Sequence, residues 1–416
     1  MDSEIKIFAD DTFIYRIVDQ NSTEKLNQDL EKITVWANTW KMEFNPSLSK
    51  QAVEVCFSSK HTPSVFEILE FNGIPVLQAS GTKHLGLLLD LRLDFKKHLA
   101  EKLGKANQGL GVMKQLYKWT PRRSLEEIYK LYTRPHVDYG DIIYDIADLN
   151  KNSIFTSTTS NLRMENIEKI QYQAARIVSG AWQGTSREKL YDDLGWESLQ
   201  NRRTVRKLCI LYETLKNRYP RYLSEILDDC KYRQGSRYFD LQMLKNIPCR
   251  TNKFKATCLP SAIRDWNLLC FETKTAVSKQ AFKNQILKLT RPKKKSYFGL
   301  LDKKKCKYIT LLRMGLSPLR AHKFKYNFND TEDPFCLVCE TIEDTEHFLL
   351  HCSSFRLTRV DLFQSVSNIT SFSNLNTKRK IHLLLYGDEK INAEKNRSIL
   401  DEVGNFIHKS KRLDGF

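Results

Sequence analysis

The sequence contains no run that approaches about 18 consecutive apolar residues, the length that a membrane-spanning helix needs. It also lacks a secretory or transit signal, because the acidic start Met1-Asp2-Ser3-Glu4 leads directly into a strand-like pattern. No solenoid-type repeat is present. These absences exclude membrane-spanning and solenoid proteins, and we expect a nuclear or cytoplasmic protein.

The ten cysteines accompany no secretory signal, so they do not indicate a disulfide framework. Reduced thiols or metal ligands are expected instead. Seven of the cysteines show no ligand spacing and are expected to be small buried hydrophobic residues. These seven are Cys56, Cys209, Cys230, Cys249, Cys258, Cys270 and Cys306.

Acidic residues are in deficit, since 49 of them stand against 67 basic residues and the net charge is +18. A surplus of this size favours a polyanionic partner, of which nucleic acid is the common one. A merely basic globular protein is the alternative. The 416 residues, 41% of them hydrophobic, are enough for more than one buried core, and the length favours about two to four units.

Two adjacent carboxylates, Asp10 and Asp11, lie between two short alternating apolar runs in residues 5–15. This pattern predicts a β-hairpin with the acidic pair at its turn. Neighbouring carboxylates repel each other unless a cation lies between them, and polymerases that transfer phosphoryl groups use a pair of divalent metal ions. An ordinary surface turn, in which Asp is common, is the alternative.

The periodicity of the apolar residues changes at about residue 95 from a strand-like to a helical one. Before it, we expect a helix capped by Asn21, a hairpin that turns at Asn72-Gly73, and a single apolar strand over residues 84–90. After it, long helices are expected, of which the one over residues 125–132 is stopped by Pro135. The sequence therefore predicts an α+β fold that is mostly helical after its first part.

A second chemical pattern is Cys336-x2-Cys339-x7-His347-x4-Cys352. Three thiolates and one imidazole suit tetrahedral Zn²⁺, and a closed set of four ligands indicates a structural site. His351 is a rival ligand, and scattered thiols are the alternative. If zinc is bound, we expect Phe335, Phe348 and Leu349 to pack over the site and His351 to point away.

The segment Phe8-Ala9-Asp10-Asp11 resembles the aromatic-Ala-Asp-Asp motif of the reverse transcriptases of non-LTR retrotransposons, of the jockey-like group. Glu346-His347-Phe348-Leu349 before Cys352 is similar to the C-terminal block of that family. Further blocks resemble the regions that follow the motif, and their order supports the resemblance over nearly the whole chain. They are residues 36–45, 84–90, 131–140, 167–176, 194–203 and 260–267.

The resemblance implies a partial polymerase palm in residues 1–95, thumb-like helices in 96–150 and a helical region in 151–290. It further implies a basic linker and helix in 291–330, a zinc-binding module in 331–370 and a helical tail in 371–416. In the family, Asp10 with Asp11 beside it would hold the catalytic Mg²⁺ pair. The implied partners are RNA and DNA, bound through their backbones.

A thumb rests on the product duplex, so basic residues of the thumb-like helices are expected to neutralise phosphates without reading sequence. A solvated helix face is the alternative, and Trp119 is expected in the core. The expected phosphate-binding residues are Lys102, Lys105, Lys114, Lys118, Arg122 and Arg123.

The front of the chain departs from the family, in which fingers and a third metal-binding Asp precede the hairpin. Here Met1 lies nine residues before Asp10. The expectation is therefore a truncated RNA-directed DNA polymerase that is inactive alone. A nucleic-acid-binding module retained from the element and a non-functional relic or partial gene model stay open.

Overall fold

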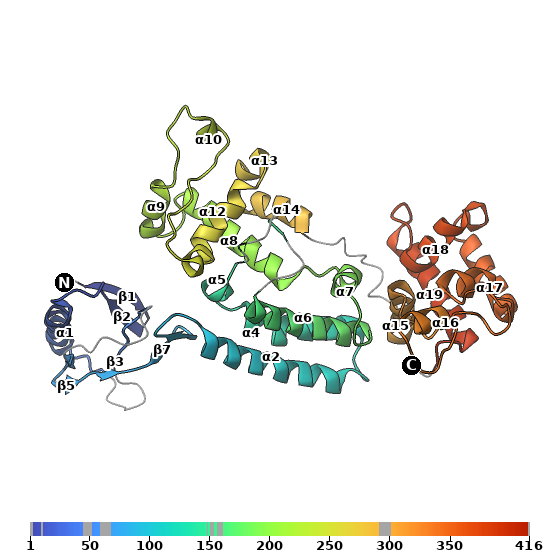
Figure 1. Ribbon diagram of the computed structural model, residues 1–416, viewed down its shortest axis with the longest axis horizontal. Helices are drawn as coiled ribbons and strands as arrows, with labels where there is room; N and C mark the ends of the chain where they lie inside the picture. Colours follow the sequence, from blue (N-terminus) through green and yellow to red (C-terminus); the bar gives the residue numbers. More distant parts are fainter. Residues whose placement is uncertain are drawn as a thin grey trace. The chain divides into compact units, whose positions relative to one another are not determined.

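The computed structural model describes residues 3–9, 11–44, 52–58, 68–147, 149, 154–155, 161–290 and 301–414. The chain divides into two units, Met1–Glu101 and Lys102–Phe416. All named strands of the described ranges lie in the first unit, and the second is built from helices (Figure 1). The α+β class predicted from the sequence is confirmed.

Most of the strand pairs in the described part of the first unit are short antiparallel hairpins. Strands β1 (Glu4–Phe8) and β2 (Asp11–Tyr15) pair so that Phe8 faces Asp11, as the alternating pattern predicted. Strands β4 (Glu70–Phe71) and β5 (Ile74–Pro75) are joined by Asn72 and Gly73, whose φ angles are 54° and 73°. Positive φ at both positions is what a type I′ turn requires, so this predicted turn is confirmed.

Residues 84–90 are not the single strand that the sequence suggested. Strands β7 (Gly81–His84) and β8 (Leu87–Asp90) pair with His84 opposite Leu87, and Leu85 and Gly86 form the turn with φ angles of 44° and 79°. The prediction was wrong because a Leu-Gly turn carries no Asn or Asp to mark it. Gly81 permits a close approach of the two strands, because a Cβ atom there would lie 2.5 Å from the carbonyl oxygen of Leu89.

Helix α1 (Ser22–Thr39) follows Asn21, as predicted, but the Asn21 side chain makes no capping hydrogen bond. Its apolar face is only partly covered by the described residues of its unit, since Trp36 and Trp40 are exposed. Strand β3 (Val53–Glu54) pairs in parallel with β6 (Leu77–Gln78).

Helix α2 (Lys96–Leu116) begins in the first unit and provides the first element of the second. None of the helices in the described ranges combines the length and the apolarity that crossing a membrane requires. The helices that follow are α3 (Arg122–Ile128), η1 (Tyr129–Thr133), α4 (Pro135–Asp138), α5 (Asp141–Tyr144), α6 (Leu162–Ser179), α7 (Arg187–Leu194), α8 (Leu199–Leu215), α9 (Arg221–Asp228), α10 (Arg237–Asp240), α11 (Asn252–Lys255), α12 (Cys258–Asn267), α13 (Phe271–Lys274), α14 (Lys279–Thr290), α15 (Lys303–Met314), α16 (Arg320–Lys325), η3 (His347–His351), η4 (Ser353–Phe355), α17 (Arg356–Ser367), η5 (Phe372–Asn374), α18 (Thr377–Tyr386) and α19 (Ala393–Ser410).

Pro135 does not stop the helix that precedes it, contrary to the prediction. Residues 129–133 form the π-helical turn η1, and Pro135 occupies the first turn of α4. The amide of Arg134 donates to the carbonyl of Tyr129 at 2.8 Å, five residues back. A proline at the first position of a helix loses no hydrogen bond, and the π-turn lets the chain continue past it.

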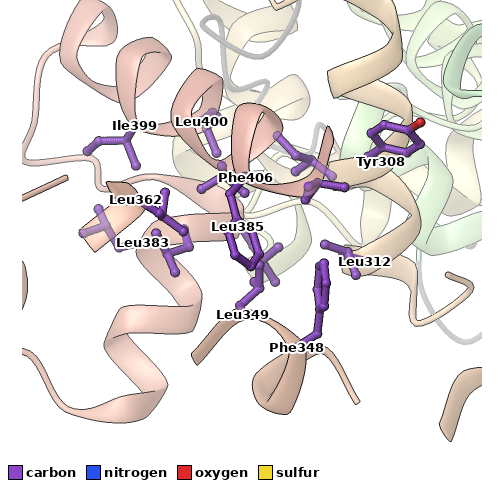
Figure 2. Packing of buried hydrophobic residues seen from close by; sticks show 14 of the residues in the cluster. Tyr308, Leu312, Phe348, Leu349, Leu362, Leu383, Leu385, Ile399, Leu400 and Phe406 are labelled. Carbon is purple, nitrogen blue, oxygen red and sulfur yellow. The ribbon is translucent and has the colours of Figure 1, made fainter. Parts of the chain in front are cut away.

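Among the described residues of the second unit, two of the hydrophobic cores each join several helices. One joins α8, α12 and α14 through residues such as Leu208, Ile263 and Phe282. The other joins α15, η3, α17, α18 and α19, and Figure 2 shows how Leu312, Phe348 and Phe406 meet in it. This second core draws on three segments that the sequence-based division kept apart, namely 291–330, 331–370 and 371–416.

Candidate metal centre and nucleic-acid interface

The segment 335–342 folds back on itself and forms the turn that carries the first two cysteines. Phe335 and Ile342 form an isolated β-bridge. The amide of Cys336 donates to the carbonyl of Thr341 at 2.7 Å, and the amide of Glu340 donates to the carbonyl of Cys336 at 2.9 Å. Glu340 has a φ of 53°, which lets the chain reverse directly after Cys339.

One ligand atom from each of Cys336, Cys339, His347 and Cys352 lies within 4.8 Å of the other three. The sulfur of Cys352 is 3.9 Å from the sulfur of Cys336 and 3.9 Å from that of Cys339. A disulfide would require about 2.05 Å. Three sulfurs around tetrahedral Zn²⁺, each about 2.3 Å from the metal, stand about 3.8 Å apart. The cysteine spacings therefore fit a zinc ion.

The imidazole of His347 is oriented for metal binding. Its Nδ1 lies 3.1 Å from the hydroxyl of Thr341. Its Nε2 is buried and has no hydrogen-bond partner among the residues that the structure describes. Burial lowers the pKa of His347, which favours the neutral ring that a metal needs. A second partner that fixes the ring through its other nitrogen is usual for metal-bound histidine.

Ser353 supports the ligand set from outside it. Its amide donates to Cys339 Sγ at 3.3 Å, and its hydroxyl lies 3.1 Å from the same sulfur. These contacts lower the pKa of the Cys339 thiol, whereas burial raises the pKa of the Cys352 thiol to about 11. A bound divalent cation would deprotonate both thiols. Four protein ligands leave no position for a reacting water, so the arrangement can hold a structural metal.

The neighbours of this cluster agree only in part with the prediction. His351 is exposed and lies 3.7 Å from the Glu346 carboxylate, outside the cluster, as expected. Phe348 and Leu349 are fully buried and belong to the second core. Phe335 is 47% exposed. The cluster is thus attached to the large core through η3, and it does not stand on a small core of its own.

Asp11 is the described member of the acidic pair. Asp11 is exposed and is the first residue of β2, and Asp10 lies outside the described residues. Of the described residues, only the Cys336 group brings three or more potential ligands together, so Asp11 is part of no such cluster. The role of the pair in binding Mg²⁺ remains a prediction.

The six basic residues predicted to contact phosphates do not share one face. Lys102 and Lys105 lie near the start of α2, whereas Lys114 is nine residues further along it, about 180° around the helix from Lys105. Lys105 and Lys114 are exposed, as are Lys118 and Arg123. They therefore form at least two groups.

Arg122 is buried and does not fit the prediction. Its guanidinium donates to the carboxylate of Asp193 at 2.7 Å, and both side chains are less than a tenth exposed. It also lies 3.3 Å from Thr310. The sequence grouped it with the other basic residues of the thumb-like helices, but of Arg122 and Arg123 only Arg123 is exposed.

Lys102 and Lys105 have aromatic and basic neighbours. The ammonium of Lys102 lies 5.8 Å from the centre of the exposed Tyr139 ring. Burial, and then the charges of Lys102 and Lys105, lower the pKa of His136. The two lysines of this group lie on α2, His136 lies on α4, and Tyr139 directly follows α4.

Trp119 is 84% exposed, so its predicted place in the core is wrong. It follows the end of α2. Nearby, an open groove of about 610 Å³ lies between α2 and the following helices and is lined by Val112, Leu116, Arg123 and Leu131, among others.

Two known proteins match parts of this chain. The chain is 28% identical over 198 residues to a Drosophila melanogaster protein described as "Probable RNA-directed DNA polymerase from transposon X-element", covering 46% of this chain and 20% of that relative. It is 27% identical over 125 residues to "Probable RNA-directed DNA polymerase from transposon BS" of the same organism, covering 29% of this chain and 14% of that relative. The chain is therefore reverse-transcriptase-like.

The predicted resemblance to a retrotransposon reverse transcriptase is thus confirmed. The matches span no more than 20% of the length of these relatives. No protein-family model and no solved structure matches the reverse-transcriptase-like chain.

One block that carries the resemblance, residues 194–203, is part of the buried framework of this reverse-transcriptase-like chain. Trp196 stacks on Tyr129 with ring centres 4.7 Å apart and donates to Glu126 at 3.2 Å. The buried carboxylate of Glu168 accepts from the amides of Leu199 and Gln200, the first residues of α8. An anion is stabilising at a helix N-terminus. The block therefore holds the start of α8 in place.

Sequence reasoning missed the residues that surround the candidate sites. Thr341 and Ser353 lie within two residues of a ligand cysteine, so their position beside Cys339 and Cys352 was the available signal. Tyr139 and His136 gave no such signal, because only the return of the chain after η1 brings them to Lys102.

Proposed function

We propose that this chain is the part of a retrotransposon RNA-directed DNA polymerase that holds nucleic acid through its phosphates. In this proposal, residues 1–95 contribute to the palm and residues 96–150 to the thumb. The observation that carries it is the group of Lys102 and Lys105 beside His136 and Tyr139, in a chain with a net charge of +18. The similarity to transposon polymerases supports the choice of nucleic acid over other polyanions.

Binding should be independent of sequence. Lysine ammonium groups are point charges that neutralise phosphates, and specific readout needs side chains that reach base edges. Lys114, Lys118 and Arg123 would add a second set of phosphate contacts. Arg122 is left out because its charge is buried and paired with Asp193.

Two metals belong to the proposal in different roles. Cys336, Cys339, His347 and Cys352 would hold Zn²⁺, which would stabilise the fold around η3. Asp10 and Asp11 would bind Mg²⁺, because adjacent carboxylates suit a hard cation with oxygen ligands. When bound, Mg²⁺ would neutralise charge on the phosphates of a substrate.

The test compares the 416-residue chain with the double variant Lys102→Gln/Lys105→Gln on an RNA–DNA hybrid duplex. Affinity of the unchanged chain should fall steeply with salt between about 50 and 200 mM. The double variant should bind more weakly, and its slope of log affinity against log salt should be smaller by about one to two, one for each lost phosphate contact.

Lys390→Gln/Lys395→Gln is the matched control, since both lysines are exposed and lie in the last part of the chain. It removes the same charge and should leave the salt slope nearly unchanged. An equal loss in the two double variants would mean that only net charge matters, and the proposed interface would be wrong.

A further inference from the structure

The segment 230–245, between α9 and α12, projects from the helical core as a long excursion whose two ends are held together by backbone contacts. Figure 1 shows it with α10 at its far end. Lys231 and Leu244 form a β-bridge, and the amide of Lys245 donates to the carbonyl of Cys230 at 2.7 Å. These contacts close the excursion where it leaves the core.

Side chains of helix α12 hold the base of the excursion in place. The side chain of Asn267 accepts from the amide of Leu244 at 2.9 Å and donates to its carbonyl at 2.8 Å, as a neighbouring strand would. The indole of Trp266 donates to the carbonyl of Gln242 at 2.8 Å. Trp266 and Asn267 belong to a block that carries the family resemblance, and here they position this excursion.

Aromatic side chains lie on the excursion and outside the core. Tyr232 and Tyr238 stack with ring centres 4.9 Å apart and an angle of 28° between the rings. Tyr238 is 51% exposed and its neighbour Phe239 is 38% exposed. Exposed aromatic rings in a folded loop leave apolar surface in water, which indicates a surface that is covered by a ligand.

Positive charge is interleaved with these rings. The ammonium of Lys245 lies 5.8 Å from the centre of the Tyr232 ring. Arg233 and Arg237 are exposed and form no ion pair with any residue that the structure describes. Residues 231–245 contain four basic side chains and one acidic one, Asp240. This net positive charge favours binding to a polyanion over binding to a protein surface with few acidic residues.

We infer that this excursion is a stacking platform for single-stranded nucleic acid, a second site that rests on the proposed nucleic-acid function and adds a base-contacting surface to it. Unpaired bases would stack on the exposed ring of Tyr238, which Tyr232 supports from its other side, while Arg233 and Arg237 neutralise the adjoining phosphates. A duplex keeps its bases inside its stack, so it gains nothing from exposed rings. Stacking depends on the flat face that every base has, so the platform tolerates any sequence.

The test uses a single-stranded RNA of about 12 nucleotides that carries 2-aminopurine, a length within the range of known stacking sites. Tyr232→Leu/Tyr238→Leu should lower the affinity for this RNA by about tenfold and abolish the quenching of 2-aminopurine that stacking causes. Tyr232→Phe/Tyr238→Phe keeps the rings and should restore both. Affinity for the RNA–DNA duplex should stay the same in all three proteins.

Tyr326→Leu is the matched control. Tyr326 is 44% exposed and has the ammonium of Lys325 at 5.8 Å from its ring, so it copies the cation and ring of Tyr232 at another place. It should change neither affinity. If the leucine variant binds the single strand as the unchanged chain does, the platform is wrong even where duplex binding stands. If neither the single-stranded RNA nor the RNA–DNA duplex binds the unchanged chain, the proposed function itself fails.

Discussion

Asp193 on α7 and Arg313 on α15 form a buried ion pair, with Oδ1 and Nη1 2.6 Å apart and both side chains less than a twentieth exposed. The second oxygen of Asp193 accepts from Arg122 on α3 at 2.7 Å. Burial by itself would raise the pKa of Asp193, and the two guanidinium groups reverse this and lower it. Arg313 also donates to the carbonyl of Leu385 at 2.7 Å. The carboxylate of Asp193 thus joins α3 and α7, which precede residues 291–300 in the sequence, to α15, which follows them.

Replacing Asp193 with Asn should destabilise the second unit strongly. The change keeps the shape of the side chain but leaves Arg122 and Arg313 buried without a counter-charge, and removing one partner of such a group costs about 3–5 kcal/mol. Urea unfolding followed by circular dichroism measures the change in free energy. Asp361→Asn is the control, because its pair with Lys409 is exposed and is worth about 0–1 kcal/mol. Equal losses in the two variants would contradict a structural role for the buried pair.

The sequence predicted elements whose signal is local. Asn72-Gly73 specifies its turn by its own backbone preferences, and the 3.6-residue period of α2 is visible without any partner. The four residues of the metal cluster could be grouped because their spacing is short enough for one turn and one helix to bring them together. In these places, residues that are close in the sequence determine the local structure.

Predictions failed where the reason lies far along the chain. Nothing near Arg122 shows that Asp193, 71 residues later, pairs with it. Trp119 is a residue type that is usually buried, but the segment that ends α2 turns it outward. Tyr232 and Tyr238 lie in a stretch without a regular apolar period, so no local pattern in the sequence indicates that their rings stack.

The glycines of helix α2 differ in the space around them. A Cβ on Gly109 would lie 2.5 Å from the hydroxyl and 3.3 Å from the Cα of Thr133 in η1, whereas Gly104 and Gly111 have nothing within 4 Å. Gly109→Ala should therefore cost about 1–3 kcal/mol through overpacking. Gly104→Ala and Gly111→Ala should stabilise the chain by about 0.5–1 kcal/mol, because alanine favours the helix. Thermal unfolding of the three variants measures these signs, and stabilisation by all three would show that α2 and η1 do not approach closely.

His322 should make stability depend on pH. Burial lowers its pKa to about 4 from 6.5, and its Nδ1 lies 2.7 Å from the Ser317 hydroxyl. The unfolded chain therefore binds the proton first, so stability is complete above about pH 6.5 and is lost as the pH falls toward 4. The loss attributable to this group is about 3 kcal/mol. His322→Gln should show a smaller fall over this range, as measured by urea unfolding at several pH values. Parallel curves for the two proteins would exclude His322 as the cause.

The metal cluster gives the last prediction. Cys339→Ser should abolish binding of one zinc ion per chain, because it removes one of three thiolates around a tetrahedral site. Metal binding is coupled to folding, so amide protection from hydrogen exchange should fall in residues 335–355. Metal analysis of the purified protein and hydrogen exchange with mass spectrometry measure the two effects.

The extent of the lost amide protection distinguishes a metal cluster attached to the second core from a small module that folds independently. Since Phe348 and Leu349 on η3 belong to the core of α15, α17, α18 and α19, loosening around η3 should spread to that core. The core of α8, α12 and α14 should keep its protection, because it shares no residue with the second core. Cys270→Ser is the matched control, since Cys270 is an exposed thiol outside the cluster, and it should retain the metal. If the chain binds no zinc, or if Cys339→Ser retains it, these four residues are not a zinc site.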